Sequence, residues 1–311
     1  MNNLLVVAQD APHYAQLLAA ANLADLRVTL DTASLSRCNL LLGEPRRLAP
    51  LLDRVERAPH LACVQSTFAG VDALCRPGLR RDYHLTGVKG IFGPLMSEYV
   101  FAYLLALERR LFEARENQRA ARWQPLAYRP LEGKTMGVAG LGDIGRHIAA
   151  TGRHFGLAVR GYRRSGGPLA EMPEVAVYGQ GAFDAFLQGL DYLVLVLPDT
   201  PATQGLVDSD ALSRLPSHAV VVNVGRGAAV DQDALAAALA QGGLRAAVLD
   251  VFQSEPLPAD HPLWHQPNAY LTPHHAAVSF PADIVALFAA NYRRFCRGLP
   301  LDFEVDFTRG Y

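Results

Sequence analysis

Residues 135–145 read TMGVAGLGDIG, a short apolar run that leads straight into three closely spaced glycines. The run suits a buried strand, and the residues after it, RHIAATGRHFG, suit a helix. At such a strand-to-helix turn the first glycine allows the tight turn, the second lets a pyrophosphate approach the backbone, and the third lets the helix pack closely on the strand. The free N–H groups of the helix start attract phosphate. We predict a dinucleotide-binding loop formed by Gly140, Gly142, Asp143, Ile144 and Gly145. The alternative is a tight turn that holds no ligand.

Short runs rich in Val, Leu and Ile alternate with longer Ala-rich segments on both sides of this loop. Such alternation is typical of β–α units whose parallel sheet is buried on both faces. The expected strands fall into two sets. They are 4–8, 27–30, 40–43, 61–65 and 85–88, then 135–140, 158–162, 175–178, 192–197, 219–224, 246–251 and 269–271. The fold class we predict is α/β, with two Rossmann-like doubly wound parallel-sheet domains.

The length of 311 residues also favours two domains, at about 150 residues each. We expect a helix after Gly93-Pro94 that continues through SEYVFAYLLALERR, and a polar, proline-containing connector or arm over 115–134. The apolar helix expected at 282–295 has no strand after it, so we expect it to return to the first domain. The predicted substrate domain is therefore 1–97 with 281–311. The predicted dinucleotide-binding domain, 98–280, is inserted within it and includes the linking helix and the arm.

Composition excludes several classes of protein. With 50% hydrophobic and 19% charged residues the chain can bury a large core, and 29 basic against 30 acidic residues leave no general basic field to hold a nucleic acid. The four cysteines fit neither a CxxC motif nor a dense disulfide frame, so we expect reduced core thiols. No apolar run approaches the roughly 20 residues that cross a bilayer. We expect a cytoplasmic protein without a membrane partner.

The residues at the end of the second strand of the dinucleotide-binding domain distinguish the two nicotinamide cofactors. An Asp or Glu at that point accepts hydrogen bonds from the ribose hydroxyls of NAD. Here the sequence is instead Gly-Tyr followed by Arg163, Arg164 and Ser165. Two guanidiniums and a hydroxyl are donors suited to a 2′-phosphate, each contributing about 1.5–3 kcal/mol. We predict that NADP(H) is preferred over NAD(H), against the alternative of a solvated basic turn.

Three later segments each place one polar residue after a predicted strand. Arg226 lies in NVGRG, Glu255 in DVFQSEP and His274 in LTPHH. Ligands of doubly wound sheets bind outside the carboxyl ends of the strands, so these side chains are expected to converge beside the nicotinamide. A histidine can give a proton to a developing alkoxide, a carboxylate can fix its tautomer, and an arginine can hold a carboxylate and polarise a carbonyl. The set suits carbonyl reduction.

These motifs resemble those of the D-isomer-specific 2-hydroxyacid dehydrogenases, and most closely the glyoxylate/hydroxypyruvate reductase branch. The matching segments occur in the family's order across about 135–280, and AGVD at 69–72 extends the match into the first domain. They are GLGDIG, LPDTPATQGLV, NVGRGAAVDQDAL, LDVFQSEPLPADHPLW and LTPHHAA. The resemblance is far more specific than a GxGxxG motif alone.

The resemblance implies a role for each matched residue. Arg226 would bind the 2-oxoacid, His274 would be the acid/base beside the cofactor, and Glu255 would orient His274. A loop of Phe68, Ala69 and Gly70 would present N–H groups to the substrate carboxylate. The remaining residues expected to line the cofactor pocket are Leu197, Pro198, Thr203, Val224, Gly225 and Asp250. The resemblance also implies a homodimer.

Three departures from the family's pattern limit this transfer. Phe68 replaces the glycine of many relatives, which would either narrow the pocket in favour of small oxoacids or leave the ring packed outward. His275 adds a second histidine beside His274, and a shared or reversed role is the alternative to His274 as the catalyst. Trp123 lies in the arm, which in related reductases carries a Trp to the partner subunit's active site, so it either reaches a partner or packs within its own chain. His261 and His265 have helical spacing, but the surrounding prolines indicate an irregular loop and we expect no metal site.

The predicted activity is NADPH-dependent reduction of a small 2-oxoacid, either glyoxylate to glycolate or hydroxypyruvate to D-glycerate, with His274 as acid/base. One alternative is a different substrate within the same dehydrogenase family. A second is a non-catalytic dinucleotide sensor similar to the corepressors of this family. A third is a methyltransferase that uses S-adenosylmethionine, for which Arg226, Glu255 and His274 would have no purpose.

Overall fold

Two parallel sheets, each with its own hydrophobic core, organise the computed structural model, which describes residues 1–310. Unit 1 comprises Met1–Ile91 and the chain from Val278 onward, and unit 2 is Phe92–Ala277. The unit boundaries therefore lie at residues 92 and 277, where the sequence suggested 98 and 280. The first boundary moves because helix α3 (Phe92–Glu108) is continuous from its first residue and packs as a whole in unit 2.

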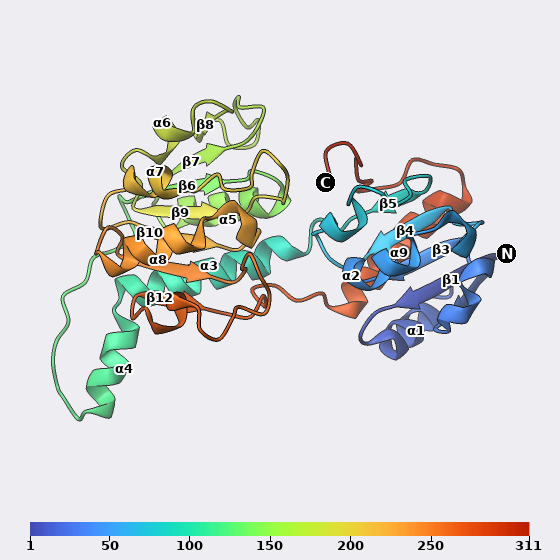
Figure 1. Ribbon diagram of the computed structural model, residues 1–311, viewed down its shortest axis with the longest axis horizontal. Coiled ribbons are helices and arrows are strands. Elements are labelled where there is room, and N and C mark those ends of the chain that lie inside the picture. Colours follow the sequence, from blue (N-terminus) through green and yellow to red (C-terminus); the bar gives the residue numbers. More distant parts are fainter. Residues whose placement is uncertain (311) are drawn as a thin grey trace. The chain divides into compact units, whose positions relative to one another are not determined.

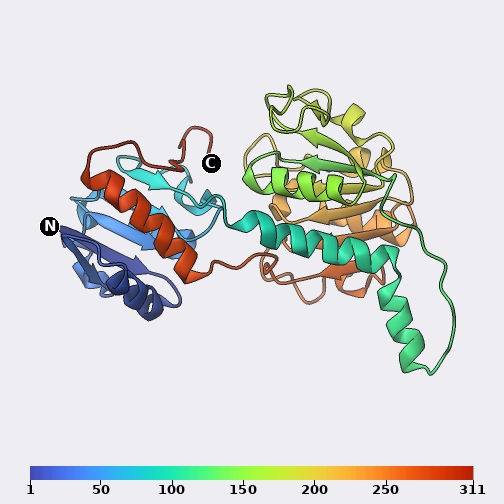
Figure 2. The ribbon, with the colours of Figure 1, turned by 180° about the vertical axis from the view of Figure 1, so that it is seen from behind.

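Unit 1 has five parallel strands in the order β2-β1-β3-β4-β5. They are β1 (Asn2–Val7), β2 (Leu26–Thr29), β3 (Leu40–Gly43), β4 (Cys63–Ser66) and β5 (His84–Thr86). The helices are α1 (Ala11–Ala20), α2 (Pro45–Leu48) and α9 (Pro281–Cys296). Helix α9 lies beside α1 and in contact with it (Figure 2). The hydroxyl of Tyr292 in α9 donates a hydrogen bond to the carbonyl of Ala24. The prediction that the last helix returns to the first domain is confirmed.

Unit 2 has seven parallel strands in the order β12-β11-β10-β9-β6-β7-β8. They are β6 (Thr135–Ala139), β7 (Ala158–Tyr162), β8 (Ala176–Tyr178), β9 (Tyr192–Leu195), β10 (Val220–Asn223), β11 (Ala246–Leu249) and β12 (Ala269–Leu271). The direction of winding reverses at β6, with β7 and β8 to one side of it and β9 to β12 to the other. In doubly wound sheets, ligands bind at the carboxyl ends of the strands beside such a reversal.

Helices cover both faces of this sheet (Figures 1 and 2). Helices α3 and α5 (Asp143–His154) cover one face, and α6 (Phe183–Leu187), α7 (Ser209–Ser213) and α8 (Gln232–Ala240) cover the other. Strand β9 shows that both faces of the sheet are buried. Its residues Tyr192 and Val194 belong to the core under α3 and α5, whereas Leu193 and Leu195 belong to the opposite core. Apolar residues at every position are needed because both faces are buried.

The sequence predictions for the strands agree with the structure to within two residues at each end. The predicted arm was wrong in part. Leu111–Arg119 forms helix α4, and only the chain after it, up to residue 134, has neither helix nor strand. Helix α4 was not predicted from the sequence because it is mostly polar. It extends from the body of unit 2 (Figure 1). Among the described residues, no helix has the length and apolar character needed to span a bilayer.

Candidate active site

The glycine-rich loop follows β6 as predicted and begins α5. Gly140 has φ +101, and a Cβ there would lie 2.4 Å from the carbonyl oxygen of Val196. A Cβ on Gly145 would lie 1.8 Å from the carbonyl oxygen of Gly140, so both glycines are required by backbone packing. Gly142 differs, because nothing lies within 4 Å of the position of its Cβ. The loop thus leaves open backbone at the start of α5, which fits the approach of a pyrophosphate.

The basic turn after β7 contains three polar residues, Arg163, Arg164 and Ser165, whose surroundings differ. The guanidinium of Arg163 donates to the carbonyls of Gly166 at 2.8 Å, Gly167 at 3.2 Å and Pro168 at 3.3 Å, and so closes the turn on itself. Arg164 and Ser165 are exposed at the tip. No carboxylate follows β7 within this turn, so the residues present fit a 2′-phosphate better than a free ribose hydroxyl.

Arg226 is placed by the turn that follows β10. The side chain of Asn223 accepts a hydrogen bond from the backbone N–H of Gly225 at 3.1 Å and donates one to the carbonyl of Arg226 at 3.0 Å. A Cβ on Gly227 would lie 1.9 Å from the carbonyl carbon of Phe252. The turn that carries Arg226 therefore packs backbone to backbone against the loop that carries Glu255. These roles of Asn223 and Gly227 were not predicted from the sequence, although both residues stand in the motif NVGRG.

The predicted histidine and carboxylate form a close pair. Nδ1 of His274 lies 2.9 Å from Oε2 and 3.1 Å from Oε1 of Glu255, although the two residues are 19 positions apart. The backbone N–H of Phe252 donates to the same carboxylate at 3.2 Å. The side chain of Glu255 is 18% exposed and that of His274 is 47% exposed. With Nδ1 held by the carboxylate, Nε2 is the ring atom left to exchange a proton with a substrate.

The loop that carries His274 is held by one buried carboxylate. The backbone N–H groups of three successive residues, His274, His275 and Ala276, donate to the carbonyl, Oδ1 and Oδ2 of Asp250 at 2.8, 2.8 and 3.0 Å. Asp250 is 0% exposed. His274 has φ +53, a left-handed conformation that a residue other than glycine adopts only at a cost in free energy. Asp250, which the sequence analysis assigned to the cofactor pocket, thus holds the backbone around the candidate catalyst.

The other residues assigned to the cofactor pocket lie at the ends of β9 and β10. Leu197 and Val224 are buried, and a Cβ on Gly225 would lie 2.6 Å from the backbone nitrogen of Leu197. The hydroxyl of Thr203 donates to the carbonyl of Pro198 at 2.6 Å and closes the loop after β9. The structure therefore brings this group together along the carboxyl edge of the sheet in unit 2.

The candidate substrate loop belongs to unit 1, where it follows β4. The backbone N–H of Phe68 donates to the hydroxyl of buried Ser66 at 3.0 Å, and that hydroxyl donates to the carbonyl of Phe68 at 2.7 Å. Phe68 and Ala69 are exposed, the ring of Phe68 being 41% exposed, and Gly70 is half-buried. Exposed residues of this loop therefore lie at the carboxyl end of a strand, where ligands of doubly wound sheets bind.

The structure bears on two questions that the sequence left open: where Trp123 packs, and how His274 and His275 differ. Trp123 is 100% exposed, so the suggestion that it packs within its own chain is wrong. Glu255 bonds to His274, whereas the ring of His275 lies edge-on to Tyr99 at 6.4 Å. The region of His261 and His265 is also more regular than expected, since Pro262–His265 forms a 3₁₀ helix whose first N–H groups include one capped by His261.

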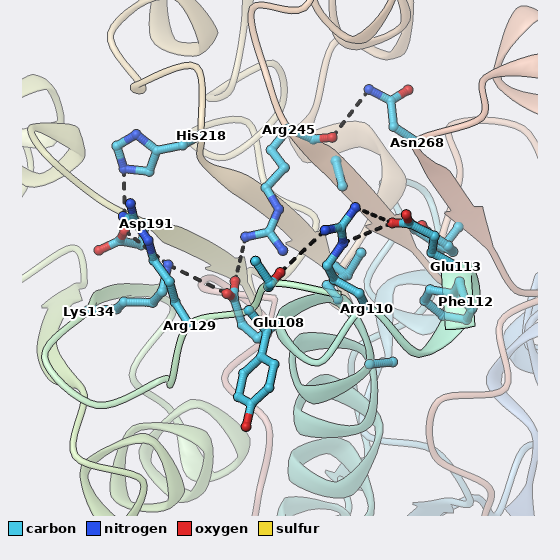
Figure 3. A pocket seen from close by; sticks show the side chains of 16 residues that line it. Glu108, Arg110, Phe112, Glu113, Arg129, Lys134, Asp191, His218, Arg245 and Asn268 are labelled. Carbon is cyan, nitrogen blue, oxygen red and sulfur yellow. Dashed lines mark hydrogen bonds and ion pairs between the residues drawn. The ribbon is translucent and has the colours of Figure 1, made fainter. Parts of the chain in front are cut away.

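A separate cavity of about 680 Å³ lies at the opposite, amino end of the sheet in unit 2. In Figure 3, Arg245 points toward Glu108, Arg110 toward Glu113 and His218 toward Asp191. Glu108 is bonded to Arg245 at 2.5 Å and lies 3.7 Å from Lys134, while Asp191 lies 3.3 Å from His218. None of the residues predicted for hydride chemistry lines this cavity. The candidate active site is therefore the carboxyl edge, not this cavity.

Several known proteins are similar to this chain in sequence and in structure. Residues 101–276 match the family model described as D-isomer specific 2-hydroxyacid dehydrogenase, NAD binding domain. A glyoxylate/hydroxypyruvate reductase A of Klebsiella pneumoniae is 37% identical over 220 residues, which is 70% of each chain. A family member from Aeromonas salmonicida has a crystal structure with TM-score 0.91 and 45% identity, covering 98% of this chain and 99% of that one.

A third similar protein has a solved cofactor complex. The NADPH-dependent glyoxylate/hydroxypyruvate reductase of Sinorhizobium meliloti, crystallised with NADP and sulfate, has TM-score 0.87 and 29% identity and covers all of both chains. The family model spans more than half of this chain, and the Klebsiella relative matches over two thirds of it. This protein therefore belongs to the D-isomer-specific 2-hydroxyacid dehydrogenases, a family of oxidoreductases.

Proposed function

We propose that this protein reduces glyoxylate to glycolate and hydroxypyruvate to D-glycerate with NADPH. The observation that carries the proposal is the pairing of His274 with Glu255 at 2.9 Å. The loop that holds Glu255 also packs against the turn that holds Arg226. A proton donor, its orienting carboxylate and a carboxylate-binding guanidinium are the groups that reduction of a 2-oxoacid needs. The names of the Klebsiella and Sinorhizobium relatives support the same choice of substrates.

NADPH, when bound, supplies the hydride that adds to C2 of the oxoacid. The residues of the chain do the rest. Arg226 binds the substrate carboxylate with paired N–H donors and polarises the carbonyl. His274 gives a proton from Nε2 to the carbonyl oxygen as that oxygen gains charge, and Glu255 stabilises the ring at Nδ1 throughout. One oxoacid, one NADPH and one proton thereby give one 2-hydroxyacid and one NADP⁺.

The choice of NADPH rests on the turn after β7. In this proposal Arg164 and Ser165 contact the 2′-phosphate, while Arg163 keeps the turn closed through its three backbone carbonyls. The NADP in the Sinorhizobium structure supports the same preference. NAD(H) is a weaker second cofactor, because the turn offers no carboxylate to its ribose.

The competing functions are separated by chemistry and by exposed residues. A dinucleotide sensor of the corepressor kind needs no histidine–glutamate pair, yet that pair is intact here. A bulkier oxoacid is the alternative within the family, and Phe68 at the substrate loop disfavours it by occupying space that glycine would leave free. Fully exposed Trp123 on the arm supports a homodimer in which this side chain lies at the partner's site.

The test follows oxidation of NADPH and of NADH by the purified protein with glyoxylate, hydroxypyruvate and pyruvate in parallel. Rapid turnover of the first two acids with NADPH is expected. His274→Gln should abolish turnover and still bind NADPH, whereas the matched change His275→Gln should retain turnover. Arg226→Lys should raise the KM for the oxoacid, because a lysine loses the paired contact. Tight NADPH binding without turnover of any acid would favour the sensor.

A further inference from the structure

A tyrosine on helix α3 is connected to the catalytic loop through two hydrogen bonds. The hydroxyl of Tyr99 lies 2.5 Å from Oγ1 of Thr272, and Thr272 donates to Oδ1 of Asp250 at 2.6 Å. A threonine hydroxyl has a single proton, and here the ionised carboxylate receives it. Tyr99 must therefore be the donor in the first bond. Tyr99 thus donates to Thr272, and Thr272 donates to Asp250.

The end of this chain is the carboxylate that holds the backbone around His274. Oδ1 of Asp250 accepts both the Thr272 hydroxyl and the N–H of His275, and Oδ2 accepts the N–H of Ala276. Hydrogen bonds to charged groups are stronger than neutral ones, and linked bonds polarise each other. Thr272 also anchors the loop through its own backbone, since its carbonyl accepts the N–H of His274 at 3.0 Å. A shift of Thr272 would consequently move His274.

We propose that Tyr99 is a positioning residue that keeps His274 in its left-handed conformation and in contact with Glu255. The inference rests on the proposed function, in which His274 is the proton donor. Tyr99 does not touch the catalytic pair. It acts by donating to Thr272, which fixes both the side chain and the backbone at the start of the loop.

The surroundings of Tyr99 suit this task. Its ring packs on Tyr103 of the same helix at 5.0 Å and on His275 at 6.4 Å, so the ring is confined from two sides. Burial raises the pKa of Tyr99 well above its usual range. The phenol therefore keeps its proton throughout the pH range in which the enzyme can be assayed, and the donor is constant.

The test removes the hydroxyl and keeps the ring. Tyr99→Phe should lower kcat for glyoxylate by about three- to tenfold, the effect of losing one partly buried hydrogen bond. The KM for NADPH should not change, because the loop of Gly140 to Gly145 is untouched. The primary isotope effect with deuterated NADPH should rise, since misplacing the proton donor slows the chemical step. The matched control is Tyr270→Phe, a ring in contact with Tyr103 whose hydroxyl makes no hydrogen bond in the described structure.

A second variant tests the route. Thr272→Val removes the intermediate hydroxyl and keeps a branched side chain. If Tyr99 acts through Thr272, the double variant should be no slower than Thr272→Val alone. Simple multiplication of the two effects would overturn the proposed route, and so would equal losses in Tyr99→Phe and Tyr270→Phe or an unchanged kcat in Tyr99→Phe.

A spectroscopic reading is independent of turnover. A histidine Nδ1 proton bonded to a carboxylate gives a downfield proton resonance, which His274→Gln should remove and thereby assign. Tyr99→Phe should weaken or broaden this resonance, and Tyr270→Phe should not. If the wild-type protein reduces no oxoacid, the proposed function fails, and this resonance still decides the role of Tyr99. An identical resonance in wild type and Tyr99→Phe would refute the inference even in an active enzyme.

Discussion

At the scale of single residues, adjacent side chains of the same type do different work. The guanidinium of Arg163 donates hydrogen bonds to three backbone carbonyls, whereas the next residue, Arg164, is exposed. The same contrast separates His274, which is paired with Glu255, from His275, which lies against an aromatic ring. The sequence predicted that these residues form a site. The resemblance already favoured His274 over His275, but the sequence could not separate Arg163 from Arg164, because that depends on which of two neighbouring side chains turns toward the protein.

The arginine doublet gives the first prediction. Arg164→Ala should weaken NADPH relative to NADH by roughly one to two decades in kcat/KM, because a charge-assisted bond to the 2′-phosphate is lost. Arg163→Ala should instead weaken both cofactors, since the turn loses its brace. Steady-state kinetics with both cofactors measure the ratio. If the two variants change the NADPH/NADH ratio equally, this division of labour is wrong.

The cysteines give a prediction with a definite pH dependence. Burial raises the pKa of Cys75 to about 11 and that of Cys63 to about 12, and it also raises that of Cys38. Cys296 is exposed, which corrects the expectation that all four thiols lie in the core. A raised thiol pKa means less thiolate at pH 8, so Cys75 should react slowly there and about tenfold faster per pH unit up to about pH 11.

Titration with a chromogenic disulfide at pH 8 should therefore show one fast thiol in the native protein. Cys296→Ser should remove that fast phase, and Cys75→Ser should leave it in place. Denaturant should release the other three thiols. Two or more fast thiols in the native protein would contradict the burial of Cys38 and Cys63 and the partial burial of Cys75.

At the scale of helices and strands, the buried parallel strands were predictable because a short unbroken apolar run indicates a strand that is buried on both faces. The predicted strand at 192–197 ran two residues beyond β9 because Val196 and Leu197 are apolar but already belong to the loop. Helix α4 was not predicted, since it has no apolar stripe. Contacts between distant segments were also invisible, and the cluster around Glu108 is the clearest case.

The cluster around Glu108 fixes the end of α3 to the amino edge of the sheet. Its buried carboxylate accepts the hydroxyl of Tyr192 at 2.8 Å and an N–H of Arg245 at 2.5 Å. Glu108→Gln should lower the free energy of unfolding by about 1.5–3 kcal/mol, because a charged hydrogen bond is lost in a buried place. The exposed pair of Glu113 and Arg110 gives the matched control, and Glu113→Gln should cost less than about 1 kcal/mol. Urea denaturation compares the two, and equal losses would refute the importance of burial here.

At the scale of the whole molecule, the residues proposed for the chemistry are divided between the two units. The proposed phosphate loop, the basic turn, Arg226, Glu255 and His274 all belong to unit 2, whereas the proposed substrate loop belongs to unit 1. A doubly wound sheet explains the first group, because strands far apart in sequence end at one edge. The sequence predicted this arrangement from the motifs that follow each strand. Their precise distances required the fold, since Glu255 meets His274 only when β11 and β12 are paired.

This division predicts that cofactor binding and oxoacid selection change independently. Phe68→Gly alters only the substrate loop of unit 1, where the ring is 41% exposed and the Ser66 hydroxyl still holds the backbone. Removing the ring should lower the KM for oxoacids larger than hydroxypyruvate and should raise or leave unchanged that for glyoxylate, because the pocket gains space. The dissociation constant of NADPH, followed by nucleotide fluorescence, should stay within about twofold, since no unit 2 residue has changed. Phe68→Leu, which keeps most of the bulk, should behave like the wild type. A change in NADPH affinity without a change in oxoacid preference would show that Phe68 serves the cofactor, and would contradict the assignment of selectivity to unit 1.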